Sequence, residues 1–164
     1  MRSVPVAGMC GALAWLTLCL LLLAAPTTAQ AKTNRWSPAV AARLDKYWDL
    51  FLEYGALYKI APDEMAAICI QESTLLLDRE SKGNFGPCQV NWYLHSKMLC
   101  KEKIACSTQD LKSEAGIKAG FRVYKEMKRI WPWAEPCTYK GAKKGCQYGK
   151  DVQEIRTLVK QRHP

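Results

Sequence analysis

Glu72 is the side chain in this sequence whose surroundings most require a chemical explanation. The preceding run, PDEMAAICIQ, predicts a helix, because it opens with a proline suited to the first helical position, followed by two acids in the first turn. Glu72 follows Ile68 and Cys69 at helical spacing, which places it on their apolar face near the end of this helix. A carboxylate on a buried face is costly unless it is paired, hydrogen-bonded or protonated. The position therefore makes Glu72 a candidate acid or base.

A glycine-rich segment, GNFGPCQVN at 83–91, supplies a setting for that carboxylate. Its two glycines let the backbone pass close to a group that side chains would block, and its proline stiffens the segment. Gln89 carries an amide with both donors and an acceptor, the kind of group that holds an acetamido sugar. The helix and the segment together predict a site for a sugar beside an acid.

Both stretches resemble one known family. Tyr58–Ser73 is similar to the helix and Glu-Ser motif of the soluble lytic transglycosylase catalytic domain, in the goose-type lysozyme superfamily. The segment 83–91 is similar to that family's G-x-x-G-x-M-Q motif at the expected distance, with Cys88 in place of the methionine. The resemblance implies that Glu72 is the catalytic acid/base. It also implies that Ser73, Gly86 and Gln89 bind or position the substrate.

The resemblance extends over most of the chain, from about Ala39 to Val159, with one altered motif. The family's later A-Y-N motif has its nearest match at 138–140, where Tyr139 is kept and the other two residues differ. Tyr139 and the later Tyr148 are interpreted as substrate-binding walls of the cleft, and core packing with a satisfied hydroxyl is the alternative for each. Among members of that family, the sequence most resembles the small exported transglycosylases, which carry a histidine-bearing stretch like that around His95. We interpret His95 as structural.

The implied chemistry is cleavage of peptidoglycan without a second carboxylate. Protonated Glu72 would donate to the oxygen between N-acetylmuramic acid and N-acetylglucosamine, with the muramyl acetamido carbonyl as internal nucleophile. Glu72 would then take the proton of the sugar 6-hydroxyl as a 1,6-anhydro ring closes, which makes the enzyme a lyase. The resemblance implies no cofactor, and metal binding is not expected, because no Cys-x-x-Cys occurs and His95 and His163 are the only histidines.

Other functions remain open from the sequence. The nearest is hydrolysis by a goose-type muramidase, with Asp78 or Glu80 holding a water, although both also suit a solvated loop. A non-catalytic cell-wall-binding or assembly protein could keep the same fold. A basic, disulfide-rich antimicrobial protein is another class.

The first residues predict a signal peptide over 1–31, followed by one domain over 32–164. Arg2 precedes a short apolar run at 11–25, and Ala29-Gln30-Ala31 fits a small-x-small cleavage site. An uncleaved membrane anchor is the alternative, but the run is shorter than the roughly 20 apolar residues that a spanning helix needs. We expect export to the periplasm or the extracellular space, without stable membrane insertion after cleavage.

The net charge of +9 suits an anionic partner through field steering, although solubility alone would also explain it. Cell-wall polymer, nucleic acid and acidic membrane all qualify by charge. The resemblance selects peptidoglycan glycan strands over nucleic acid. It implies a monomer that accompanies a secretion or conjugation machine.

The helical periodicity predicts a mainly α domain. Ser37 and Pro38 predict the start of a helix that ends at Gly55 or continues to Tyr58. Further helices are expected from Asn91 to Leu99, from Asp110 to Trp131 and from Lys150 to Arg162, with a loop at 74–82. No long alternating run indicates strands, so at most a small hairpin is expected near 84–90. With the resemblance, the fold class is a lysozyme-like, disulfide-stapled single domain.

Six of the eight cysteines follow the signal peptide, an even number typical of disulfides in exported proteins. The short separation of Cys100 and Cys106 suits a local bridge. If the resemblance holds, Cys69 and Cys88 converge beside Glu72, and a bridge there would leave 137 and 146 to pair. Cys69 could instead be a small buried hydrophobe or pair with Cys100 or Cys106.

Overall fold

Helix α2 (Pro38–Tyr58), the longest in the part of the chain that the structure describes, begins where the sequence predicts. The Ser37 hydroxyl accepts a hydrogen bond from the Val40 amide at 3.3 Å, which satisfies one of the free N–H groups of the first turn. The helix continues through Gly55 and ends at Lys59, whose φ of 57° is left-handed. These features come from a computed structural model that describes residues 35–132, 136–140 and 146–164, all within one unit, Asn34–Pro164. The predicted signal peptide at 1–31 lies outside the described residues.

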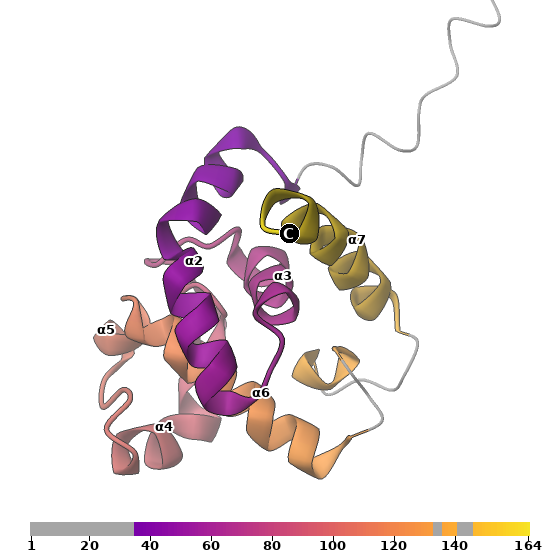
Figure 1. The fold of residues 1–164 in the computed structure, drawn as a ribbon. Coiled ribbons are helices and arrows are strands. Elements are labelled where there is room, and N and C mark those ends of the chain that lie inside the picture. The colour runs from indigo at the N-terminus through magenta and orange to yellow at the C-terminus, as the bar shows by residue number, and fades with distance from the viewer. Residues whose placement is uncertain (1–34, 133–135, 141–145) are drawn as a thin grey trace, which may run out of the picture. The chain divides into compact units, whose positions relative to one another are not determined.

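Helix α3 (Pro62–Ser73) packs against α2, α6 (Ala115–Ile130) and α7 (Gln147–Arg162). Figure 1 shows it between α2 and α7. Every residue from Glu64 to Ile70 is buried, as expected for a helix enclosed on several sides. Because α3 is central, a side chain at its end is held by the core of the protein.

A small antiparallel sheet follows α3, with strand order β1 (Glu80–Ser81), β2 (Asn84–Phe85) and β3 (Val90–Asn91). Phe85 pairs with Glu80 on one side and with Val90 on the other. The prediction of at most one hairpin was wrong by one strand, because β1 lies in the segment predicted to be a loop. Strands of two residues are too short to show the alternation by which strands are recognised in a sequence.

The helix predicted from Asp110 to Trp131 is divided in two. After α4 (Trp92–Lys101), the short α5 (Thr108–Leu111) begins with a capping box between Ser107 and Asp110, and α6 starts afresh at Ala115. A side chain on Gly116 would place its Cβ 2.1 Å from the Leu111 carbonyl oxygen, so the end of α5 packs directly on the first turn of α6. This contact accompanies the division of the predicted helix into α5 and α6. Helical periodicity in the sequence does not reveal such a tertiary contact.

The C-terminal helix α7 is joined to the first turn of α3 by charged groups. Arg156 lies 2.6 Å from an Asp63 oxygen and 3.3 Å from a Glu64 oxygen. Glu64 is 5% exposed and also accepts the hydroxyl hydrogen bond of Tyr124 from α6. The buried carboxylate of Glu64 therefore has the partners that a buried charge requires.

The described part is mainly helical and has three disulfides, as the sequence predicted, and its small sheet has three strands where at most one hairpin was expected. The bridges join Cys69 to Cys88, Cys100 to Cys106 and Cys137 to Cys146, which confirms the predicted pairing. The last of these connects the 3₁₀ helix η2 (Cys137–Lys140) to the start of α7. Among the residues that the structure describes, none of the helices has the length and apolarity needed to cross a membrane.

Candidate functional site

Glu72 lies in the last turn of α3 with its side chain only 5% exposed. One carboxylate oxygen, Oε2, accepts a hydrogen bond from Lys140 Nζ at 2.8 Å. The other, Oε1, is buried and has no hydrogen-bond partner among the described residues. An unsatisfied buried polar atom costs about 1–3 kcal/mol, or more when it is charged, and the Tyr148 hydroxyl is a neighbouring donor that interacts with Glu72.

Two pockets meet at Glu72, and we name them by their linings. The cationic pocket, of about 320 Å³, is lined by Arg35, Gln71, Glu72, Arg79, Ser81, Lys82, Asn84, Gln89, Lys140 and Tyr148. The apolar pocket, of about 390 Å³, is lined by Glu72, Asn84, Gln89, Val90, Asn91, Leu94, His95, Val123, Met127, Trp131, Tyr139 and Lys140. They share Glu72, Asn84, Gln89 and Lys140, so the carboxylate lies where one pocket passes into the other.

Glu72 is the only carboxylate among the described residues that line these two pockets. Asp78 and Glu80 are exposed and line neither pocket, and Glu80 forms an ion pair with Lys112 at 2.6 Å. Within the described part of the chain, no three His, Cys, Asp or Glu side chains gather as a metal site would require. The described lining of the two pockets thus offers one carboxylate.

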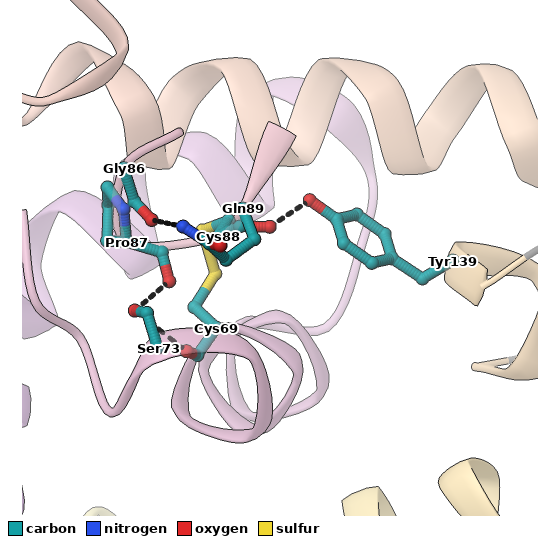
Figure 2. The surroundings of a disulfide bond; sticks show 7 residues. All are labelled: Cys69, Ser73, Gly86, Pro87, Cys88, Gln89 and Tyr139. Carbon is teal, nitrogen blue, oxygen red and sulfur yellow. Dashed lines mark hydrogen bonds between the residues drawn. A yellow bond between two sulfur atoms is a disulfide. The ribbon is translucent and has the colours of Figure 1, made fainter. Parts of the chain in front are cut away.

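The disulfide between Cys69 and Cys88 joins α3 to the glycine-rich segment, with their Cα atoms 4.1 Å apart. Figure 2 shows a second link beside it, in which the Ser73 hydroxyl points at the Pro87 carbonyl and donates to it at 2.5 Å. Ser73 is buried, and this contact positions the end of α3 next to the segment that carries Gln89. The covalent and hydrogen-bonded links hold Glu72 and Gln89 in a fixed relation.

Gln89 is held by its own amide group. Its Nε2 donates to the carbonyl oxygens of Gly86 at 3.0 Å and Arg79 at 3.1 Å, which engages both amide hydrogens. The remaining hydrogen-bonding capacity of this side chain belongs to its carbonyl oxygen. Because Gln89 lines both pockets, that oxygen is suited to accept a hydrogen bond from a ligand N–H or O–H.

Gly86 is required by packing against α5. Its φ is 76°, and a Cβ there would lie 1.8 Å from the Leu111 carbonyl oxygen, so no other residue fits this backbone. Gly86 lines neither pocket, and its carbonyl is engaged by Gln89. The structure thus gives this predicted site residue an indirect part, which is to bring the segment close to α5.

Tyr139 reaches the glycine-rich segment from η2. Its hydroxyl donates to the Cys88 carbonyl at 2.5 Å, and Figure 2 shows the ring extending toward that carbonyl from the side opposite Ser73. Burial, and then the negative charge of Glu72, raises the pKa of Tyr139 well above its usual value, so the hydroxyl stays neutral. Tyr139 is both a core residue, as the alternative prediction held, and a wall of the apolar pocket.

Tyr148 lies on the other side of Glu72, in the cationic pocket. Its hydroxyl is buried and interacts with Glu72, although the two groups do not meet the geometry of an ordinary hydrogen bond. The Lys140 ammonium lies 5.5 Å from the Tyr148 ring centre. Burial, followed by the charge of Glu72, raises the pKa of this hydroxyl far above its usual value. Tyr148 can therefore serve as a neutral donor beside the carboxylate.

The structure adds residues that the sequence reasoning missed. Lys140, one of the two residues at 138–140 that differ from the A-Y-N motif, forms the ion pair with Glu72. His95, interpreted as structural, lines the apolar pocket, and burial followed by the charge of Arg122 lowers its pKa below the ordinary value. The departure at Lys140 was the one sequence signal that could have drawn attention to it.

The two pockets are lined by side chains from α3, the small sheet, α4, α6, η2 and α7. Their walls thus come from segments as far apart in sequence as α3 and α7, which are brought together around one carboxylate. Comparison with known proteins identifies no family for the chain. The chain matches no protein-family model, no curated protein and no solved structure.

Proposed function

We propose that this chain is an exported peptidoglycan lytic transglycosylase with a lysozyme-like domain, and that Glu72 is its acid/base. The observation that carries the proposal is the placement of Glu72, a buried carboxylate with one unpartnered oxygen among the described residues, where two pockets meet. A sugar chain lying through both pockets would place a glycosidic bond beside that carboxylate. The three disulfides support an oxidising, exported setting.

In the first step, protonated Glu72 gives its proton to the glycosidic oxygen as the bond to the muramyl C1 breaks. The muramyl acetamido carbonyl oxygen bonds to C1 and forms a cyclic oxazolinium ion. N-acetylglucosamine leaves with the proton on its 4-oxygen. No second carboxylate is needed, which agrees with the lining of the two pockets.

In the second step, charged Glu72 takes the proton of the muramyl 6-hydroxyl while that oxygen attacks C1. The C1 bond to the acetamido oxygen breaks, the acetamide is restored, and a 1,6-anhydro ring is the product. Lys140, 2.8 Å from Oε2, stabilises the charged form of Glu72 that this step requires. Its own side chain is 49% exposed, so it can withdraw when Glu72 is protonated for the next cleavage.

The other site residues position the reacting groups. Gln89 offers its amide oxygen to the sugar, and Ser73 holds the end of α3 against the glycine-rich segment. Tyr148 offers a neutral hydroxyl beside Glu72, while Tyr139 holds the Cys88 carbonyl and lines the apolar pocket. These assignments give each of the four residues a part in the proposed cleavage.

The proposal favours a lyase over the muramidase alternative. A hydrolase of this kind needs a second group to hold the attacking water, and the two acids considered for it, Asp78 and Glu80, line neither pocket. Glu80 is also engaged by Lys112.

Mass spectrometry of purified peptidoglycan after incubation with the protein tests the proposal. We expect muropeptides with 1,6-anhydromuramyl ends and no incorporation of oxygen from labelled water. Reducing ends that carry the label would show a hydrolase. Absence of released fragments, with Glu72→Gln as a blank, would refute cleavage altogether.

A further inference from the structure

The two pockets beside Glu72 differ sharply in charge. The cationic pocket has four basic side chains in its lining, Arg35, Arg79, Lys82 and Lys140, against the single acid Glu72. Lys140 is the one Lys or Arg among the described residues that line the apolar pocket. Half of its twelve lining residues are apolar or aromatic, namely Val90, Leu94, Val123, Met127, Trp131 and Tyr139. A ligand that spans both pockets therefore meets positive charge on one side of the carboxylate and apolar surface on the other.

Three of the four cations are not engaged by acids of the described chain. Lys140 pairs with Glu72, whereas Arg35, Arg79 and Lys82 form no ion pair with any residue that the structure describes. All three are exposed, so they keep their hydration and can bind an arriving anion. Their charge exceeds what is needed to balance Glu72.

Arg79 also has an anchored backbone. Its carbonyl oxygen accepts hydrogen bonds from the Gly86 amide at 2.8 Å and from Gln89 Nε2 at 3.1 Å. Lys82 follows β1 directly and belongs to the turn between β1 and β2. The small sheet thus holds these two cations at the rim of the pocket, next to the residues that the proposed reaction uses.

We propose that the cationic pocket selects glycan strands by an anionic substituent, namely the carboxylates of a peptide attached to the muramyl lactyl group. This inference rests on the proposed function, and it assigns an orientation to the glycan strand in the two pockets. The muramyl residue would enter the cationic pocket, and the N-acetylglucosamine that leaves would occupy the apolar pocket. A neutral glycan of the same backbone, such as chitin, lacks the group that Arg79 and Lys82 would bind.

The chemistry of the cations agrees with such a ligand. A guanidinium binds a carboxylate through two parallel hydrogen bonds, and a lysine adds a mobile point charge. Exposed contacts of this kind are individually weak, so selection needs several of them acting together. The pocket offers three cations in addition to the one that pairs with Glu72.

Binding of two soluble strands tests the inference. Peptide-bearing glycan strands and the same strands after amidation of their peptide carboxylates, with ammonia and a carbodiimide, are titrated into the Glu72→Gln protein, which prevents turnover. We expect roughly fivefold to 20-fold tighter binding of the untreated strands at low salt, from several contacts each changing affinity by about twofold to fivefold. Arg79→Gln and Lys82→Gln, added singly, should each remove about twofold to fivefold of that preference and have a smaller effect on binding of the amidated strands.

Lys46→Gln is the matched control, because Lys46 is an exposed lysine on α2 that lines neither pocket. Equal affinity for the two strands, or a preference that survives both pocket substitutions, would overturn the inference. A single-stranded oligonucleotide that competes as well as the untreated strand would also overturn it, by showing that any polyanion suffices. If the strands are distinguished but the wild-type protein releases no anhydro ends, the proposed function fails while the binding inference stands.

Discussion

The ammonium of Lys140 lies 2.8 Å from Oε2 of Glu72, across 68 residues of sequence. The pair is asymmetric, because the Glu72 side chain is 5% exposed and the Lys140 side chain is 49% exposed. The carboxylate is fixed in the core, whereas the cation reaches it from solvent. Lys140 can therefore change partner without disturbing the position of the acid.

Replacing Lys140 by Asn should lower the cleavage rate by roughly 10-fold, because Oε2 of Glu72 loses the charged hydrogen-bond donor that stabilises its charged form in the second step. Asn is the residue that the A-Y-N motif has at this position. The measurement is the rate of release of anhydro ends at one pH. Lys46→Asn serves as control and should leave the rate unchanged. An unchanged rate in Lys140→Asn would show that Lys140 has no part in the proposed reaction.

Glu72→Gln should lower the cleavage rate by at least about 100-fold, because the amide keeps the shape of the side chain and loses the proton transfer. The thermal unfolding midpoint should stay close to that of the wild type. Glu80→Gln is the control, since Glu80 is exposed, pairs with Lys112 and lines neither pocket. Wild-type rates in Glu72→Gln, or an equal loss in Glu80→Gln, would contradict the assignment.

Removing the Cys69–Cys88 bridge, as the double Ala variant, should lower the free energy of unfolding by about 2–4 kcal/mol. It should also lower the cleavage rate by roughly 10-fold to 100-fold, because the glycine-rich segment would no longer be clamped to α3 beside Glu72. Chemical denaturation and steady-state rates measure the two effects.

The Cys100–Cys106 bridge provides the comparison. It closes a shorter segment, with a sequence separation of 6 against 19, and its cysteines line neither pocket. The double Ser variant should lose less stability and keep the wild-type cleavage rate per folded molecule. Equal losses of activity in the two variants would mean that the bridge beside Glu72 has no special part in the site.

Arg156→Gln should destabilise the protein at neutral pH by about 1–3 kcal/mol, chiefly because buried Glu64 loses a charged partner. The matched change is Arg162→Gln, which removes an exposed partner of Asp45 and should have a much smaller effect. Urea unfolding of both variants at one pH gives the comparison. A larger loss in Arg162→Gln would show that the link between α3 and α7 is misjudged.

The same variant should show a distinct pH dependence. Burial acts to raise the pKa of Asp63, but the hydrogen bond and charge of Arg156, with the charge of Lys160, bring it below the ordinary value of 3.8. A carboxyl with a lowered folded-state pKa contributes stability above its unfolded pKa and loses it as the pH falls through the folded pKa. The stability difference between wild type and Arg156→Gln should therefore shrink below a pH of about 4. A difference that grows on acidification would contradict this pairing.

Several features were predictable from the sequence because they depend on near neighbours. The start of α2 follows from Ser37 and Pro38, since a cap and a first-turn proline act within one turn. The place of Glu72 at the end of a buried helix face follows from the helical period. The pairing of Cys69 with Cys88 needed the family resemblance as well, because cysteine spacing alone leaves the partners open.

Tertiary structure decided the rest. Strand β1, which the sequence did not predict, forms by pairing with β2, and both strands are too short to show a period in the sequence. The break before α6 accompanies the packing of Leu111 against Gly116. The ion pair between Glu72 and Lys140 requires η2 to come back against the end of α3, which no local pattern specifies. The two unlike pockets exist only because the sheet, η2 and α7 converge on one carboxylate. The acid could be found from its own helix, whereas its charge partner and its pockets come from distant segments that only folding brings together.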